Sequence, residues 1–379
     1  MRKNNTIVDL FSGCGGFGLG AEYAGFHTLA AIDIDPILQS SYKKNFPKTK
    51  VISGDLAKMD KDSWRIILKG EEVDGVIGGP PCQGYSRIGK SDVSDPRRSL
   101  VAHFFRNVNL LKPKFFVMEN VEGILDSKNL SELESAINTV SKDFVVLDPF
   151  IIDASDFGAP TVRKRVIVVG YNPSHVANIS AEDFNIKINK VNVRDAISDL
   201  PAPIPQSNDP DNYGWASYNN DVQLSNYAKE MRKVRRNLGW NIAINKIRNG
   251  EVSGFFDTVH SQTVKERYAA TRPGSTDVVS RSKKLSWDGF CPTLRAGTGS
   301  DKGSYQAVRP IHPEQQRVIT VREAARLQGF PDWFVFHPTK WHSFRMIGNS
   351  VSPLVSKEIL KIIKNKFIVD MNKVERKQG

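Results

Sequence analysis

The sequence has few cysteines and no long apolar segment. Its three cysteines, Cys14, Cys82 and Cys291, are widely separated among 379 residues. They are too few and too scattered for a disulfide framework or a zinc site, so we expect no metal and a reducing, cytoplasmic setting. No run reaches the roughly 18 apolar residues of a membrane span, and the N-terminus lacks the apolar core of a signal peptide. We therefore expect no membrane partner.

Positive charge is in excess, and it is concentrated in one region. The net charge is +12, which favours a polyanionic partner. Thirteen Lys or Arg but only six Asp or Glu lie between Ser225 and Phe290, interleaved with aromatic residues. A nucleic-acid surface and an ordinary solvated basic face explain this region equally well.

Strand and helix patterns alternate over about the first 170 residues. The expected strands are Thr6–Leu10, Leu29–Asp33, Val51–Ile52, Val73–Ile77, Phe115–Met118, Phe144–Leu147 and Val166–Val169. Alternation of this kind predicts an α/β fold, with a doubly wound, mostly parallel seven-stranded sheet and helices on both faces.

The regular pattern fails after Tyr171. Residues 172–310 are rich in Asn, Ser, Pro and basic residues, and helix patterns return only at Thr320 and at Pro353. We expect a catalytic and cofactor-binding domain over 1–171, a smaller irregular domain over 172–347, and a return to the first domain over 348–379, which includes a final helix from Pro353 to Phe367.

A glycine-rich turn follows the first strand. Gly13–Gly18 satisfies GxGxxG between a strand and a helix, and Asp33 lies twenty residues after Gly13, at the end of the next strand. This is the dinucleotide fingerprint, with glycines for the turn and an acid for ribose hydroxyls. It fits a nicotinamide cofactor and also S-adenosylmethionine, whose carboxylate can use the same helix N-terminus.

The stretch Gly78–Ser86, GGPPCQGYS, places a lone cysteine after an apolar strand. Prolines fix the backbone and glycines allow close approach, so the turn can present the Cys82 thiol, although a buried structural cysteine is the commoner role. Glu119 ends the fifth strand. Arg163 and Arg165, two residues apart, share a face of an extended chain. A helix cap and surface ion pairs are the alternative roles of these three residues.

These motifs, in this order, resemble those of the DNA cytosine-5 methyltransferases of bacterial restriction–modification systems. The matching stretches are Asp9–Gly16, Gly78–Ser86, Glu119–Val121, Arg163 with Arg165, and Gly348–Val351. Thr161 stands where the family usually has glutamine. The resemblance implies that Cys82 adds to C6 of a flipped-out cytosine, that Glu119 contacts N3, and that the arginines hold the activated ring.

The resemblance also implies S-adenosylmethionine as cofactor. Phe11 would pack against the adenine, Gly13 and Gly15 would hold the methionine part, and Asp33 would bind the ribose. Ile34 would stack on the adenine and Asp55 would accept from its amino group, although core packing and turn capping are simpler roles for such residues. The remaining expected cofactor neighbours are Leu56, Pro80, Leu100, Asn349, Ser350 and Val351.

Duplex DNA is the implied substrate, with residues 172–347 as a target-recognition domain. The loop after the nucleophile and the recognition core would contact the DNA through Ser86, Arg87, Lys90, Arg97, Arg98, Thr293 and Leu294. A cognate restriction endonuclease and a monomeric state are further expectations. The rival interpretations are a tRNA cytosine-5 methyltransferase on the same scaffold, an NAD-dependent oxidoreductase, and a catalytically silent DNA-binding protein.

Overall fold

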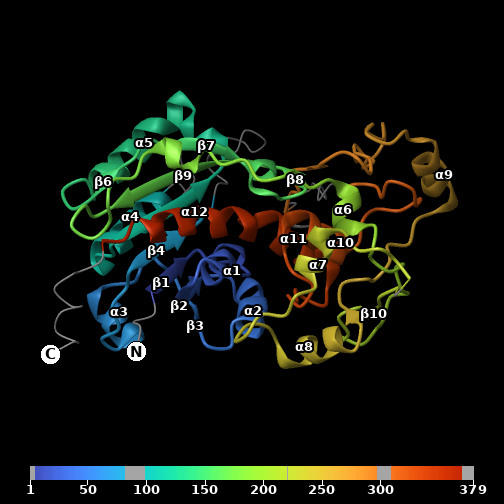
Figure 1. Ribbon diagram of the computed structural model, residues 1–379, viewed down its shortest axis with the longest axis horizontal. Helices are drawn as coiled ribbons and strands as arrows, with labels where there is room; N and C mark the ends of the chain where they lie inside the picture. The colour runs from blue at the N-terminus through green and yellow to red at the C-terminus, as the bar shows by residue number, and fades with distance from the viewer. Residues whose placement is uncertain (1–4, 82–98, 220, 297–308, 369–379) are drawn as a thin grey trace.

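The structure is a computed structural model that describes residues 5–81, 99–219, 221–296 and 309–368. Its core is an open sheet whose strands are ordered β3-β2-β1-β4-β5-β9, and β6 and β7 both pair with the outer side of β9 (Figure 1). The strands are β1 (Asn5–Leu10), β2 (Phe26–Asp33), β3 (Lys50–Ser53), β4 (Gly75–Gly78), β5 (Phe115–Asn120), β6 (Val145–Val146), β7 (Phe150–Asp153) and β9 (Lys164–Tyr171).

The described strands therefore occupy seven positions, as the sequence predicts. Pairs among β3, β2, β1, β4 and β5 are parallel, whereas β9 runs antiparallel to its neighbours. The seventh position is divided: β6 faces Gly170 and Tyr171, and β7 faces the first half of β9. The sequence predicted a single strand at Phe144–Leu147. This extent is wrong, because the structure has two separate strands here, β6 and β7. Pro149 interrupts the edge because proline has no amide to donate.

Side chains of the sheet alternate between two helical layers. Ile7, Ile77 and Val117 pack with α1 (Gly16–Tyr23) and α12 (Pro353–Asn365). Val8, Val76 and Phe116 pack on the other face with α3 (Lys61–Leu68), α4 (Ser99–Leu111) and α5 (Ser127–Asn138). The period of two in each strand thus supplies both faces of a doubly wound sheet. In the described part of the chain, no helix is long and apolar enough to span a bilayer.

Helix α12 returns the end of the chain to its beginning. It lies against α1, and a Cβ built on Gly20 would come within 1.8 Å of the Ser356 Oγ. Ser352 occupies the N-cap position, although its side chain makes no capping hydrogen bond, and the helix ends at Asn365 rather than at the predicted Phe367.

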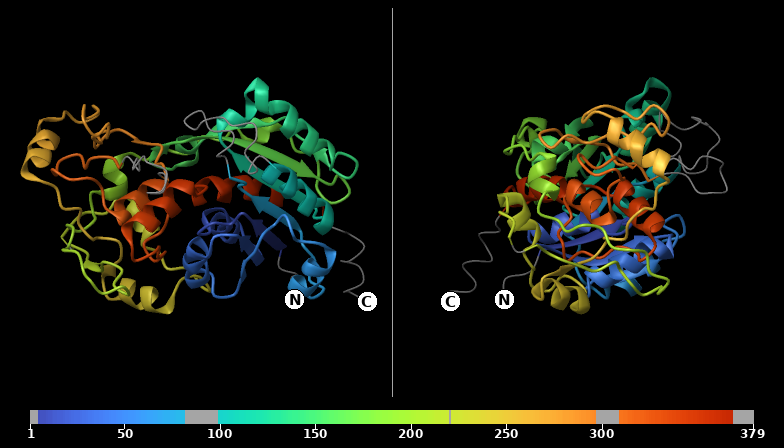
Figure 2. Two further views of the ribbon diagram at one scale, coloured as in Figure 1. Left: turned by 180° about the vertical axis from the view of Figure 1, so that it is seen from behind. Right: turned by 90° about the vertical axis from the view of Figure 1, so that its right-hand side faces the viewer.

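The segments after β9 form a second lobe beside the sheet (Figures 1 and 2). It contains short helices and two-residue strands, and α9 lies at its far end. These elements are α6 (Val193–Ile197), α7 (Asn226–Met231), α8 (Asn241–Arg248), α9 (Gln262–Ala270), β10 (Ala216–Ser217) and β11 (Glu251–Val252). This irregularity agrees with the weak periodicity of the sequence.

Helices α10 (Val321–Gln328) and α11 (Lys340–Asn349) join the two lobes. Helix α10 starts at Thr320, as predicted, with a capping box in which the Thr320 amide donates to Glu323 at 2.6 Å. Its apolar side packs in one cluster with residues of α2 (Pro36–Asn45), α6 and α7.

A buried charge network reinforces this junction. The Arg326 guanidinium, which is inaccessible to solvent, donates to Asp332 at 2.5 and 2.7 Å and to Asp199 at 3.2 Å. Arg232 pairs with Asp199 at 2.6 Å, and the Tyr218 hydroxyl donates to Asp332. Parts of the second lobe that are distant in sequence therefore converge on one side chain of α10.

Candidate active site

The predicted motifs meet at one edge of the sheet. Strand pairing aligns Leu10 with Ile32 and with Gly78, and Gly78 in turn with Met118. The residues just after this row lie together at the carboxyl ends of the parallel strands. These are the glycine turn, Asp33, the Gly79-Pro80-Pro81 segment and Glu119. Carboxyl ends beside a reversal of strand order are the usual ligand-binding edge of such folds.

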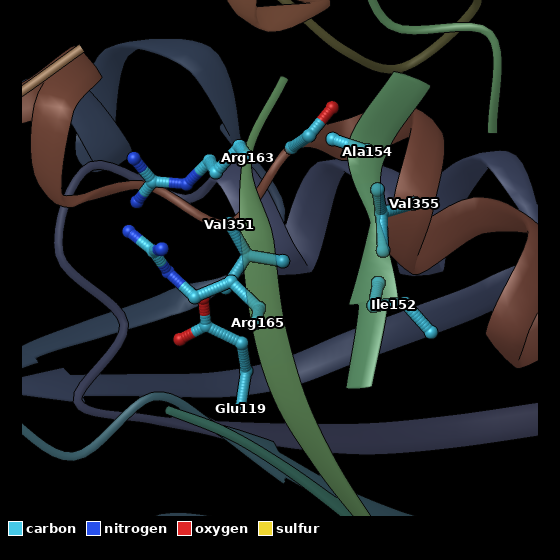
Figure 3. Close-up of a pocket in the computed structure, with 8 residues that line it drawn as sticks. Glu119, Ile152, Ala154, Arg163, Arg165, Val351 and Val355 are labelled. Carbon is cyan, nitrogen blue, oxygen red and sulfur yellow. The ribbon is translucent and has the colours of Figure 1, made fainter. Parts of the chain in front are cut away.

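Glu119 and the two arginines line one small hollow (Figure 3). Arg165 Nε lies 2.9 Å from Glu119 Oε1, and both side chains are largely buried. The remaining wall comes from β7, the turn after it and the start of α12, through Ile152, Ala154, Val351, Ser352 and Val355. A carboxylate, two guanidinium groups and an apolar wall therefore meet at one point of this edge.

Arg163 ties three parts of the chain together at this hollow. Its guanidinium donates to the carbonyl of Leu294 at 3.2 Å and to that of Gly348 at 3.0 Å. Its own amide donates to Asp153, at the end of β7. Arg163 is 3% exposed, so it contributes a fixed positive charge at the back of the site rather than a mobile surface group.

Thr161 joins the second lobe to the same segment. Strand β8 (Thr161–Val162) pairs in parallel with β12 (Cys291–Pro292), and the Thr161 hydroxyl donates to the Cys291 carbonyl at 3.1 Å. Thr293 donates to the Val162 carbonyl at 2.9 Å. Thr293 and Leu294 therefore lie directly beside the arginine segment.

The predicted nucleophile lies outside the described residues, as do Ser86, Arg87, Lys90, Arg97 and Arg98. The chain before Cys82 can be followed to the site. A Cβ built on Gly79 would lie 3.5 Å from Glu119 Oε2, and Asn120 donates to the Pro80 carbonyl at 3.3 Å. The segment that leads to Cys82 thus starts in contact with Glu119.

The glycine turn and Asp33 form the second part of the edge. The Gly13 amide donates to Asp33 Oδ2 and the Asp35 amide to Oδ1, both at 2.9 Å. Burial raises the pKa of Asp33, against the opposing effect of these amides. Gly13 and Gly15 have φ values of +54° and +101°, which favour glycine.

The other predicted cofactor neighbours surround this turn in different ways. Ile34 is 71% exposed at the edge, whereas Leu56 is buried in the core. Phe11 is half-buried, and Asp55 accepts from the Ala57 amide at 2.9 Å in a turn. Leu100 is half-buried on α4, and Asn349 is exposed. Pro80 and Val351 are buried, and Ser350 Oγ lies 3.1 Å from Cys14 Sγ.

Comparison with known proteins agrees with this geometry. The model of the family described as C-5 cytosine-specific DNA methylase matches residues 5–365. The type II methyltransferase M.XorII of Xanthomonas oryzae pv. oryzae is 40% identical over 95% of this chain and 85% of its own length. M.DdeI of Desulfomicrobium norvegicum is 32% identical over 94% of this chain and 88% of its own length. The chain belongs to the C-5 cytosine-specific DNA methylase family.

A solved structure supports the same assignment. A putative DNA modification methyltransferase encoded within an E. coli prophage superposes with a TM-score of 0.84 at 43% identity, over 96% of this chain and 99% of the other. The Dnmt2 methyltransferase of S. pombe, at 16% identity and a TM-score of 0.61, shares the fold. The protein is therefore a DNA cytosine-5 methyltransferase of the kind found in type II restriction–modification systems, and the oxidoreductase interpretation is wrong.

The family depends on S-adenosylmethionine, and the residues at the turn of this methyltransferase fit that molecule. A Cβ built on Gly13 would meet nothing within 4 Å, so the turn has open space in front of it. Each Asp33 oxygen accepts one backbone amide and keeps a second lone pair for a hydroxyl. The exposed Ile34 beside it offers an apolar surface for a planar base.

Several contacts that support the site of the methyltransferase were not found from the sequence. Gln39 of α2 donates to Ser12 Oγ at 2.8 Å behind the glycine turn, and Gln328 of α10 donates to the Ser350 carbonyl at 3.0 Å. Arg106 of α4 donates to the carbonyls of Leu56 and Ala57. Single polar residues on helices carry no sequence signal for such contacts, because the partner is set by tertiary packing.

Proposed function

We propose that this methyltransferase modifies C5 of a cytosine within a specific sequence of duplex DNA, using S-adenosylmethionine. The observation that carries the proposal is the ion pair between Glu119 and Arg165, in the hollow that also holds Arg163. The segment leading to Cys82 starts beside the same carboxylate. A base inside a duplex cannot reach such an enclosed group, so the cytosine must be flipped out of the helix.

Each residue then has a definite role. C5 of cytosine is a poor nucleophile until a thiolate adds to C6, and Cys82 forms that C6–S bond. Glu119 contacts N3 and the exocyclic amine as charge develops on the ring, and Arg165 holds its carboxylate in place. Arg163 adds fixed positive charge from behind. When bound, S-adenosylmethionine supplies the electrophilic methyl group. Loss of the C5 proton finally breaks the C6–S bond and releases the thiolate.

We propose that residues 172–347 recognise the target sequence. Contacts between β8 and β12 and between Arg163 and Leu294 connect this segment to the catalytic hollow. Thr293 and Leu294 lie at that connection, so a change in how the lobe binds DNA is transmitted to the arginines by a few direct contacts. The loop with Ser86, Arg87, Lys90, Arg97 and Arg98 is the expected partner of the DNA backbone on the other side.

The decisive experiment is bisulfite sequencing of genomic DNA treated with purified protein, which reports both activity and target. The Cys82→Ala variant is expected to lose methyl transfer entirely while its affinity for duplex DNA persists. Cys291→Ala is the matched control, because Cys291 is buried beside Thr161 and is expected to leave transfer nearly intact. Full activity of Cys82→Ala would refute the covalent mechanism.

A parallel assay with tRNA separates the related alternative. Transfer to genomic DNA and none to tRNA is expected. The reverse result would assign the chain to the tRNA branch of the scaffold, and binding of DNA without transfer to either would identify a silent DNA-binding protein.

A further inference from the structure

Two segments of the chain hold most of its excess positive charge. Residues 36–54 contain four lysines and no acid, and residues 228–250 contain seven Lys or Arg and one acid. Their combined excess is ten, out of a net charge of twelve for the whole chain. The segments are nearly two hundred residues apart in sequence.

The fold brings these two segments into contact. The Gly239 amide donates to the Asn45 carbonyl at 2.8 Å, where α2 ends. Lys44 Nζ lies 4.6 Å from the centre of the Trp240 ring, and Arg235 stacks over Tyr23 at the end of α1. Together they form one surface, the α2–α8 basic face, made of Lys43, Lys44, Lys48, Arg235, Arg236 and Arg248.

Most of this charge is available to a ligand. Lys43, Lys48, Arg236 and Arg248 are exposed, and among the described residues none of these four has a carboxylate within 4 Å. Arg235 and Lys233 both form ion pairs with Glu230, and Arg232 forms an ion pair with the buried Asp199. Like charges held together without counterions repel one another, so a surface of this kind gains free energy when a polyanion covers it.

The basic face lies away from the catalytic hollow. Helix α2 starts at the carboxyl edge of the sheet, where Asp33 lies, and runs ten residues, about 15 Å, toward the opposite edge. Lys43 and Lys44 are in its last turn. Figure 1 shows α2 and α8 together on the lower side of the molecule, with β8 on the upper side. A duplex seated at the hollow therefore leaves this face uncovered.

We propose that the α2–α8 basic face binds the phosphate backbone of a second segment of duplex DNA. The cations come from helix ends and loops and, apart from the half-buried Lys44, are exposed at the surface. They suit backbone contact without base recognition. Holding a second segment keeps the enzyme on long DNA while the hollow searches for its target. The proposal rests on duplex DNA being the substrate.

The test counts the duplexes that one chain holds. Short duplexes of random sequence, labelled with a donor or an acceptor dye, are mixed with the protein at low salt. Energy transfer reports bridging, and sedimentation gives the number of duplexes per chain. Wild-type protein is expected to hold two, and the Lys43→Glu/Lys48→Glu/Arg236→Glu variant one. The control Lys61→Glu/Lys128→Glu/Lys142→Glu makes the same charge change on α3, α5 and the chain just after α5, and is expected to hold two.

Methylation supplies a second measurement. On a short duplex carrying the site found by bisulfite sequencing, the basic-face variant is expected to match wild type, whereas on long DNA its kcat/KM is expected to fall several-fold. If wild type holds one duplex, or if the variant still holds two, the proposal is wrong. An acidic protein bound in place of DNA would also overturn it. The number of duplexes bound does not depend on methyl transfer, so a failure of the proposed reaction would not change it.

Discussion

Glu119 is the group whose charge the proposed chemistry uses most directly. Its carboxylate is held 2.9 Å from Arg165 Nε, so Glu119→Gln keeps the shape of the side chain and removes the ion pair. We expect kcat for methyl transfer to fall by about 100-fold or more, with little change in affinity for duplex DNA. Single-turnover transfer and DNA-binding titrations measure the two quantities.

Glu134→Gln is the matched control for that substitution. Glu134 is exposed on α5, on the face of the sheet covered by α3, α4 and α5, and its replacement is expected to leave kcat unchanged. Near wild-type turnover in Glu119→Gln would show that the carboxylate takes no part in the chemical step.

Asp9 lies beneath the glycine turn and gives the protein a pH dependence. Its carboxylate accepts from the Tyr42 hydroxyl at 3.1 Å, and burial raises the pKa of Asp9 from 3.8 to about 8. Between these values the folded state holds a proton that the unfolded chain has released. The stability from this group is therefore full below pH 3.8 and is lost as pH rises through about 8.

Asp9→Asn, which cannot ionise, is expected to flatten this profile. Urea unfolding at a series of pH values measures it. The free energy of unfolding of wild type should fall from acid toward pH 8 more steeply than that of the variant. Parallel profiles for the two proteins would show that Asp9 does not titrate in this range.

At the scale of elements, the buried network on α10 reinforces the junction between the second lobe and the sheet domain. Arg326→Met leaves Asp332 buried without its main partner, and leaves Asp199 with Arg232 as its remaining ion-pair partner. Breaking a buried pair from one side costs about 3–5 kcal/mol, and we expect a loss of this size in the free energy of unfolding. Urea unfolding measures it.

The exposed pair of Arg65 with Asp62 on α3 provides the comparison. Arg65→Met is expected to change the free energy of unfolding by less than about 1 kcal/mol, because exposed pairs contribute little. An equally small effect in Arg326→Met would mean that the network does not hold the lobes together.

The same network shows which parts of the fold the sequence could predict. Local patterns identified the strands that end in the glycine turn, in Asp33 and in Glu119, and the start of α10 at Thr320. Each of these signals depends on residues a few positions apart. The pairing of β8 with β12 and the convergence of Asp199 on Arg326 join residues about 130 positions apart. Two-residue strands and single buried charges have no periodicity that could reveal them.

At the scale of the whole molecule, the edge with the glycine turn is made from both ends of the chain. A Cβ built on Gly16 would lie 2.4 Å from the Val351 carbonyl, and Cys14 Sγ contacts Ser350 Oγ. More than 330 residues separate these partners, so the glycine turn receives its final packing only after α12 has returned to the sheet. The sequence suggested that the last helix packs on the first domain, because its apolar positions recur at helical spacing, but not which helix it meets.

The contact between α1 and α12 should therefore be sensitive to a single methyl group. In Gly20→Ala the new Cβ would meet Ser356 Oγ at 1.8 Å and the backbone of Pro353 and Lys357 at 2.6 Å, so the helices must move apart. Overpacking of this kind costs about 1–3 kcal/mol, and urea unfolding should show that loss. Gly289→Ala is the control, since its nearest neighbours lie at 3.5 Å. If both variants are equally stable, close approach of the two helices is not what joins the ends of the chain.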